Sequence, residues 1–398
     1  MKKIGVFLGD FFWSSIPYDG LPLYNLLSEH YETDLIMFDD DIRLNKKFQG
    51  HEKFYFNPEH FRNCNLKTVA NWDHFYEISS NYELILTSVH IAPKTRLPYS
   101  APVSSSWTSF SPDNKIKKIK IAQCPVAVWD AGGADVLANP RIFSDFIFVK
   151  GPIWKDWLVK MGENEDNVFV TGSPHYDNYL DEFLPFMPEP ILNKKEFNTK
   201  YQLSENSTKI LIMPCNPGSH KEYFEENMEQ LEKIYRLAEQ YSTELLVKTY
   251  PHDYIYNETE EPYTGIYRRV YTDKPQYQFI KDHFPSIKII ESQDHFSAMK
   301  YCDKLFNISG SHIAWETYFA KTTSYSLGYE NQPYYKNLPY LPDYISFPDD
   351  LMNIHMDDLT DIVHKDLKTE KDKCSDWFLN EVSIPNIVDA VKQIIGSE

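Results

Sequence analysis

The stretch that decides the fold is DKLFNISGSHIAWETYFAKTTSYSL, residues 303–327. An apolar run over 305–308 breaks at four small or polar residues, 309–312, and an apolar helical pattern then leads to a second apolar run over 323–327. This order predicts a strand, a tight turn, a helix and a second strand, which is the repeating unit of a parallel sheet. The free backbone N–H groups and the dipole at the start of such a helix favour a phosphate group.

This turn supplies the first candidate binding residues, and its sequence is open to two interpretations. In the first, the turn contacts the phosphates of a ligand and Glu316, farther along the helix, reaches a ribose hydroxyl of the same ligand. The turn residues are Ser309, Gly310, Ser311 and His312. In the second, the stretch is an ordinary connection between strands in which Ser311 caps the helix. The flanking sequence favours the first interpretation.

Strand and helix patterns alternate along the chain in two series. The first series of apolar runs covers 3–8, 34–38, 84–89, 119–128, 146–150 and 168–171. The second covers 209–213, 244–248, 287–290, 305–308 and 323–327. Alternation of such runs with helical patterns indicates parallel, doubly wound sheets. A proline-containing stretch separates the two series and reads as a linker.

The sequence therefore predicts an α/β protein made of two Rossmann-like doubly wound domains that face each other across a cleft. We expect an N-terminal domain over 1–180, a linker over 181–207 and a C-terminal domain over 208–375. The helical pattern within 376–398 is expected to cross back to the first domain.

Composition narrows the class of protein. Five cysteines without CxxC spacing indicate neither a zinc site nor a disulfide framework, which favours a reducing, cytoplasmic setting. The sequence shows neither the cleavage pattern of a signal peptide nor an apolar window long enough to span a bilayer, so we expect no integral membrane segment. The net charge is −18, yet positions 43–120 hold 12 basic and 6 acidic residues. This predicts an anionic partner for the N-terminal half, the alternative being chance clustering on a solvated surface.

Polar residues follow three predicted strands of the first series. Asp10, His90 and Asp130 each come at or after a strand end, where ligand groups gather in open α/β sheets. Asp130 precedes two glycines that let a ligand approach the backbone, so it is our first candidate for a general base, with Asp10 and His90 as alternatives. Structural roles compete, because Asp130 can cap a helix and His90 can be a hydrogen-bonded core residue.

The acidic run over 39–41 looks like a metal-binding DxD, but acids at this position are typical of turns, so no metal is expected.

Three runs resemble a known arrangement of two such domains. Residues 143–177, FSDFIFVKGPIWKDWLVKMGENEDNVFVTGSPHYD, are similar to a first domain that closes with (I/V)-x-(I/V)-T-G-x-P-x-x-D. Residues 245–253, LLVKTYPHD, look like the strand and K-x-H-P turn of the second domain, and 303–327 looks like its phosphate-binding turn. On these residues the chain resembles glycosyltransferases of the GT-B fold. Within that fold it resembles the superfamily of CDP-glycerol glycerophosphotransferases (teichoic-acid polymerases) and sugar-nucleotide epimerases.

The resemblance implies a nucleotide-sugar donor in the C-terminal domain and an acceptor over the N-terminal domain. It implies no metal and no cofactor, because such enzymes neutralise the leaving diphosphate with helix ends and side chains. The implied donor-binding residues are Gly218, Ser219, Lys248, Ser309, Gly310, Ser311, His312 and Glu316. VWDAGG, with Asp130, replaces the Trp-His-Gly of the glycerophosphotransferases, and His252 is displaced in the K-x-H-P turn. These departures favour a sugar donor, with a CDP-glycerol-type glycerophosphotransferase as the alternative.

The acceptor is expected to be anionic. The Ser/Pro-rich stretch over 98–114 predicts a mobile loop that carries Trp107 and Phe110, and Lys117 and Lys118 follow it. Two acceptors fit: a phosphate-bearing surface polymer, and DNA with hydroxymethylated bases, on which an aromatic side chain would stack near a flipped base.

A non-catalytic nucleotide-sugar-binding protein is a further alternative to the glycosyltransferase function. An epimerase would need acidic residues and a His that the sequence does not identify.

Overall fold

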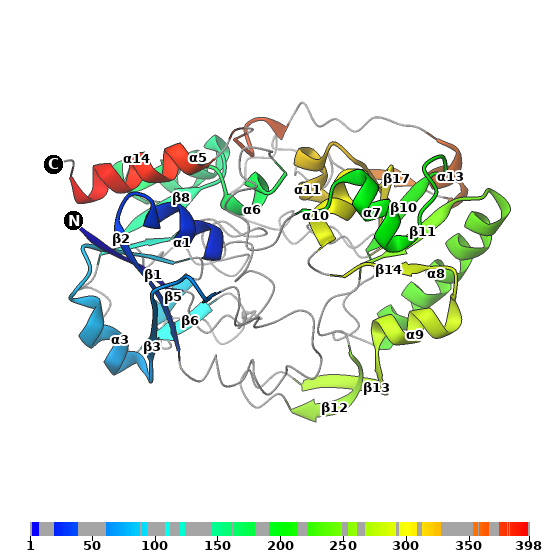
Figure 1. The fold of residues 1–398 in the computed structure, drawn as a ribbon, viewed down its shortest axis with the longest axis horizontal. Helices are drawn as coiled ribbons and strands as arrows, with labels where there is room; N and C mark the ends of the chain where they lie inside the picture. The colour runs from blue at the N-terminus through cyan, green and yellow to red at the C-terminus, as the bar shows by residue number, and fades with distance from the viewer. Residues whose placement is uncertain are drawn as a thin grey trace. The chain divides into compact units, whose positions relative to one another are not determined.

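The computed structural model divides the chain into two compact units, whose elements are labelled in Figure 1. The described residues are 2–7, 20–38, 61–87, 90–93, 108–111, 120–123, 145–160, 162–179, 191–213, 221–248, 254–260, 267–291, 294–308, 313–327, 353–356, 358–365, 374–379, 381 and 383–396. Unit 1 takes its described residues from Met1–Pro190 and Ser375–Glu398, and unit 2 takes its own from Ile191–Lys336 and Ser346–Cys374.

Unit 1 contains a seven-stranded sheet in which all neighbouring strands are parallel. The strand order is β3-β2-β1-β4-β7-β8-β9. The strands are β1 Lys3–Phe7, β2 Glu32–Phe38, β3 Leu66–Val69, β4 Leu84–Thr87, β7 Ile121–Gln123, β8 Phe146–Val149 and β9 Val168–Val170. The order reverses between β1 and β4, and the carboxyl ends at such a reversal are where doubly wound sheets bind ligands.

Helices cover both faces of this sheet. They are α1 Leu21–Ser28, α3 Trp72–Ser79, α5 Pro152–Lys160, α6 Pro174–Asp177 and α14 Ile384–Ile395. Because side chains alternate along a strand, Ile4 of β1 packs in one cluster with Leu26 of α1 and Val391 of α14. Phe7 points to the other face and packs with Phe75 of α3. A parallel sheet buried on both faces explains the continuous apolar strand sequences.

Unit 2 contains a six-stranded parallel sheet with the order β14-β11-β10-β15-β16-β17. Its strands are β10 Lys209–Met213, β11 Glu244–Val247, β14 Lys288–Ile289, β15 Lys304–Asn307, β16 Thr323–Leu327 and β17 Asn353–Met356. Its helices are α7 Lys194–Tyr201, α8 Lys221–Gln240, α9 Gln276–His283, α10 His295–Tyr301, α11 Ile313–Ala320 and α13 Thr360–His364. The order reverses between β10 and β15, so unit 2 repeats the plan of unit 1. The predicted fold class, α/β with two Rossmann-like doubly wound domains, is confirmed.

The structure differs from the sequence-based expectation in several local elements. The second half of the expected linker contains helix α7, which belongs to unit 2. Of the apolar run over 84–89, strand β4 covers Leu84–Thr87, and His90 opens the separate strand β5 His90–Pro93. Strand β5 pairs with β6 Thr108–Ser111, which falls inside the stretch expected to be a mobile loop.

Other elements were not expected from the sequence. Strand β3 and helix α3 were not predicted, because their apolar residues are few and are separated by polar ones. The acidic, Tyr-rich insertion over 254–275 contains an antiparallel pair of strands, β12 Tyr254–Glu260 and β13 Tyr267–Pro275. Among the described helices, none combines the length and the apolar character that crossing a bilayer requires.

The C-terminal helix α14 packs in the core of unit 1, beside the blue N-terminal elements in Figure 1. Lys2 Nζ donates to the carbonyl oxygens of Ile395 and Gly396, both at 2.8 Å. A lysine at this place satisfies terminal carbonyl groups of the helix and complements its dipole. The two ends of the described chain are therefore held together in one unit.

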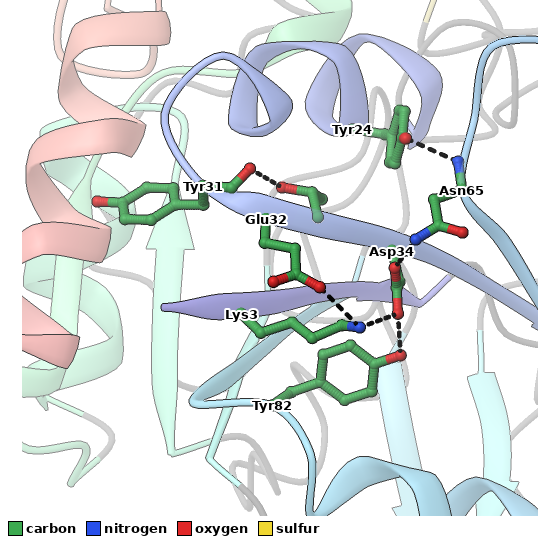
Figure 2. Close-up of polar contacts among 8 residues, drawn as sticks. Lys3, Tyr24, Tyr31, Glu32, Asp34, Asn65 and Tyr82 are labelled. Atoms are coloured by element: carbon green, nitrogen blue, oxygen red, sulfur yellow. Dashed lines mark hydrogen bonds and ion pairs between the residues drawn. The ribbon is translucent and has the colours of Figure 1, made fainter. Parts of the chain in front are cut away.

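A buried carboxylate joins the amino ends of β1, β2, β3 and β4 in unit 1, as Figure 2 shows. Asp34 of β2 is fully buried, and Tyr82 Oη donates to its Oδ2 at 2.7 Å. Lys3 Nζ lies 3.0 Å from the same oxygen and 3.1 Å from Glu32 Oε1, while Asn65 Nδ2 donates to Oδ1 of Asp34. This network fixes the edge of the sheet opposite to the carboxyl ends of the strands.

The T-G-x-P-x-x-D pattern has a structural explanation in this chain. The N–H groups of Thr171 and Gly172 both donate to the carbonyl oxygen of Val149, at 2.9 and 3.2 Å, and Gly172 has φ = +78°. The buried Asp177 accepts hydrogen bonds from the backbone N–H of Ser383, at 2.9 Å, and from its hydroxyl. Ser383 precedes α14, so the closing Asp of the pattern ties the last helix to unit 1.

Replacing Asp177 by asparagine is expected to stabilise the protein at alkaline pH. Burial raises the pKa of Asp177 to about 7, although the hydrogen bonds from Ser383 lower it. Since the folded-state pKa lies above the unfolded value of 3.8, the stability that this group contributes is fully present below 3.8 and is lost as pH rises through about 7. We expect Asp177→Asn to be more stable than the native protein by about 2 kcal/mol at about pH 8.5, and to differ little at about pH 4.

Urea denaturation at both pH values measures this difference, with Asp389→Asn, an exposed residue of α14, as the control. A variant that is less stable than the native protein at alkaline pH would show that Asp177 is needed as an ionised group.

Candidate functional site

Three neighbouring strands of unit 2 end at one edge of the sheet, at the reversal of strand order. Met213, the last residue of β10, lies opposite Asn307, the last residue of β15. Beyond these ends, the N–H of Ile308 donates to the carbonyl oxygen of Met213 at 3.1 Å, and the N–H of Lys248 donates to that of Ile212, also at 3.1 Å. The segments that follow β11, β10 and β15 therefore start side by side. These are the three segments that carry the predicted donor-binding residues.

Two of those residues lie in the described part of the chain. Lys248 directly follows β11, and Glu316 lies in the first turn of α11. The others lie outside the described residues: Gly218, Ser219, Ser309, Gly310, Ser311 and His312. The segments that carry these residues start at the ends of described strands. Those ends lie at the edge of the sheet where phosphate-binding turns occur in doubly wound proteins.

Glu316 is buried and paired with a histidine. Only 7% of its surface is exposed, and its Oε2 lies 2.6 Å from Nε2 of His295. His295 is the first residue of α10 and is also buried. Both helices run between parallel strands, so their N-termini lie at the carboxyl edge of the sheet, on the ligand side. The pair therefore joins two helix N-termini at that edge.

The backbone beside His295 is anchored to helix α7. Asp294 is the N-cap residue of α10, yet its side chain makes no capping bond and instead accepts from Tyr201 Oη and pairs with Lys200 Nζ at 2.5 Å. Lys200 Nζ also lies 3.0 Å from Glu291 Oε2, and the N–H of Glu291 donates to Tyr201 Oη at 3.1 Å. The bond to α7 thus replaces a local cap, which fixes the turn before α10.

Burial and hydrogen bonds shift the pKa values of this anchor. Burial raises the pKa of Tyr201, and the hydrogen bond to Asp294 adds to the shift. Burial lowers the pKa of Lys200, but its bonds to Asp294 and Glu291 outweigh that effect and leave its pKa above the usual value. At neutral pH Tyr201 is therefore an un-ionised donor and Lys200 a cation.

His295 was not identified from the sequence, although a signal was present. The stretch over 291–296, ESQDHF, directly follows the predicted strand over 287–290. The argument that singled out His90, a polar residue after a strand end, applies equally to this segment. Its pairing with Glu316 depends on contact between α10 and α11, which the sequence alone does not reveal.

In unit 1 a second set of strand ends lies together. Phe7 of β1 lies opposite Thr87 of β4, which lies opposite Gln123 of β7. The segments that follow these three strands carry the predicted base candidates Asp10, His90 and Asp130.

The structure leaves most of the candidates in unit 1 untested. Asp10, Asp130, Trp107, Lys117 and Lys118 lie outside the described residues. His90 and Phe110 are described by backbone only, His90 as the first residue of β5 and Phe110 in β6, opposite Ala92. These assignments therefore stay predictions.

Comparison with known proteins identifies the fold. No protein-family model and no curated protein matches the sequence. Among solved structures, the chain is similar to a UDP-GlcNAc 2-epimerase from Methanocaldococcus jannaschii, with 14% identity, a TM-score of 0.54 and coverage of 98% of this chain and 99% of that one. It is also similar to the UDP-GlcNAc 2-epimerase from Neisseria meningitidis bound to UDP-GlcNAc, with 12% identity, a TM-score of 0.55 and coverage of 99% and 100%.

A third similar structure has a different activity. The wall teichoic acid polymerase TagF matches with 12% identity, a TM-score of 0.53 and coverage of 99% of this chain and 89% of that one. At this level of identity the likeness shows a shared fold. It confirms the GT-B fold that the motifs predicted.

Proposed function

We propose that this protein is a glycosyltransferase that takes a sugar from a nucleotide-sugar bound to unit 2. The observation that carries the proposal is the meeting of three strand ends, β11, β10 and β15, at the reversal of strand order. The segments after these ends carry the candidate donor-binding residues, and the helix that follows β15 places Glu316 in its first turn. A helix N-terminus at this position offers N–H groups to a diphosphate.

The chemistry requires a base for the acceptor hydroxyl and a stabiliser for the leaving phosphate. We assign the base to Asp130, with Asp10 and His90 as alternatives, because their segments follow adjacent strands of unit 1. The turn over 309–312 and Lys248 are assigned to the diphosphate, and Glu316 to the ribose. A carboxylate accepts hydrogen bonds from two vicinal hydroxyls at once.

The acceptor is proposed to be an anionic molecule bound by unit 1. The basic composition over 43–120 supports this choice, since 12 of its residues are basic and 6 are acidic. Hydroxymethylated DNA and a phosphate-bearing polymer are the two acceptors proposed. For either one, affinity is expected to fall steeply with salt, because cations on the protein replace counterions of the polyanion.

A second candidate function is epimerisation of a sugar nucleotide. It is favoured by the correspondence in length, since the structural match covers 98–99% of this chain and 99–100% of the two epimerases. An epimerase would convert UDP-GlcNAc without an acceptor, whereas a transferase would release the nucleoside diphosphate only when an acceptor is present. Product analysis of the same incubation with and without acceptor distinguishes the two.

Ligand binding tests both candidates first. A screen of UDP, CDP, GDP and their sugar derivatives by thermal denaturation is expected to find one nucleotide that stabilises the protein. At about 100 times its Kd that ligand contributes about 2.7 kcal/mol. Inorganic pyrophosphate serves as the control for non-specific anion binding. A flat response to every nucleotide at millimolar concentration would count against the assignment of unit 2 as a donor domain.

Replacing Asp130 by asparagine is expected to lower kcat by about 10²-fold or more while donor affinity stays unchanged, because the amide cannot accept the acceptor proton. Initial rates with saturating donor measure kcat, and calorimetry measures donor affinity. Asp135→Asn, five positions along the chain, is the control and should retain activity. Near-native turnover of Asp130→Asn would exclude Asp130 as the base, and a native protein that binds donor without turnover would indicate a non-catalytic binding protein.

A further inference from the structure

We propose that His295 is a positioning residue that holds the Glu316 carboxylate for the ribose, and that the protein therefore discriminates ribonucleotides from 2′-deoxyribonucleotides. This inference rests on the proposed function, because it assumes that Glu316 faces the nucleotide. It adds a residue that the sequence motifs did not include, and it adds a selectivity that binding of the diphosphate alone would not produce.

The contact between the two side chains is short and buried. Nε2 of His295 lies 2.6 Å from Oε2 of Glu316, and the side chains are only 5% and 10% exposed. The proposed role requires an ionised Glu316, which only accepts hydrogen bonds, so Nε2 of His295 is assigned as the proton-bearing donor of this pair. Burial excludes the water that would otherwise compete for both groups, which strengthens the bond and increases the cost of losing it.

Both partners are held in place by their own helices. Trp315 and Thr317, on either side of Glu316, are 1% and 0% exposed, so helix α11 has little freedom to rotate. Asp294, next to His295, is tied to Tyr201 and Lys200 of α7. The imidazole is therefore a fixed donor that meets the carboxylate in one orientation.

This arrangement has a consequence for specificity. A buried carboxylate without a donor would have to recover its lost hydration by turning toward water or by taking up a proton. With one oxygen bound to His295, the carboxylate keeps an acceptor geometry suited to a ribose hydroxyl pair. A 2′-deoxyribose offers one hydroxyl fewer, so a hydrogen bond to a charged group is lost.

The test compares matched ribo- and deoxyribonucleotides by isothermal titration calorimetry, with UDP against 2′-deoxy-UDP and CDP against 2′-deoxy-CDP as probes. We expect the native protein to bind the ribonucleotide of one pair at least about 10-fold more tightly, which is the size of one charge-assisted hydrogen bond. His295→Phe, which keeps a ring but has no donor, should reduce this preference to about 2-fold or less, because it weakens ribonucleotide binding more than deoxyribonucleotide binding. His295→Gln, which retains an N–H donor, should restore most of it.

Two further variants separate positioning from a structural role. Tyr201→Phe removes one of the two side-chain bonds to Asp294 and keeps the pair with Lys200, so His295 stays anchored; this variant should lower Tm but keep the preference. Combining His295→Phe with Glu316→Gln should cost no more preference than Glu316→Gln alone, because both changes act on one interaction. If His295→Phe does not fold, His295→Ala, which leaves room for water, replaces it.

The outcomes distinguish this inference from the proposed function. A preference that Glu316→Gln removes but neither His295→Phe nor His295→Ala reduces would overturn the inference and leave the donor site intact. A preference that Glu316→Gln leaves unchanged would overturn the assignment of Glu316 to the ribose, and the inference with it. Absence of binding by every probe would overturn the proposed function itself.

Discussion

Replacing Asp34 by alanine is expected to lower the free energy of unfolding by about 3 kcal/mol, because a fully buried carboxylate that serves three donors is removed. The loss leaves Tyr82 and Asn65 without their acceptor. The side chain of Lys3 is 28% exposed and also pairs with Glu32, so water and that second partner recover part of its interaction. The expected loss of stability for Asp34→Ala therefore lies at the lower end of the range for breaking a buried ion pair.

Urea denaturation at neutral pH measures the effect, and Tyr82→Phe is the control that removes a single donor, with an expected cost of about 1 to 2 kcal/mol. The hydrogen bond to Asp34 raises the pKa of Lys3 above 10.5. The stability that this contact contributes is therefore fully present below pH 10.5 and is lost as pH rises through the raised pKa of Lys3. The difference in unfolding free energy between the native protein and Asp34→Ala should become smaller in that pH range. An Asp34→Ala protein as stable as the native one at neutral pH would refute the role of this network.

Replacing Gly151 by alanine is expected to destabilise the protein by about 3 kcal/mol or more, because the added Cβ would overlap backbone atoms. It would lie 2.1 Å from the carbonyl oxygen of Trp377 and 2.6 Å from the nitrogen of Phe378. Backbone cannot rotate away as a side chain can, so the segment over 374–379 would have to move. That movement would break two hydrogen bonds, from Ile153 N–H to the oxygen of Asp376 and from Leu379 N–H to the oxygen of Lys150.

Chemical denaturation with native and variant protein measures this cost. Gly162→Ala is the control, since its Cβ would meet nothing within 4 Å although Gly162 has φ = +102°. It measures the backbone strain of a Cβ at positive φ, which is about 1 to 2 kcal/mol and which Gly151 does not share. A loss below about 1 kcal/mol for Gly151→Ala would show that close packing against 377–378 is not the reason for glycine at position 151.

The sequence predicts the sheets well because parallel strands buried on both faces are continuous apolar runs. β10, β15 and β16 fall where the pattern places them, each within a residue or two. The pattern fails for helix α7, whose only buried apolar side chains are Phe197 and Tyr201, one turn apart. The signal for that helix was local and polar: Asn193 and Glu196 form a capping box.

Side-chain partners across the fold are the part that the sequence does not reveal. Glu316 was selected by its place in a helix, but its partner His295 is 21 positions away. Likewise Asp177 was noted as the end of a motif, while Ser383, which it binds, lies 206 positions later. Periodicity describes which face of an element is buried, whereas the choice of neighbours depends on how helices pack.

The return of α14 to unit 1 has a consequence for the order of events during synthesis. Unit 1 lacks part of its core until Ile387 and Val391 have left the ribosome, long after its first strands. Residues of β1, β2 and β4 that share this core with α14 thus lack part of their packing partners while all of unit 2 is being translated. The N-terminal unit completes its folding last, so co-translational chaperones have the longest access to its apolar surface.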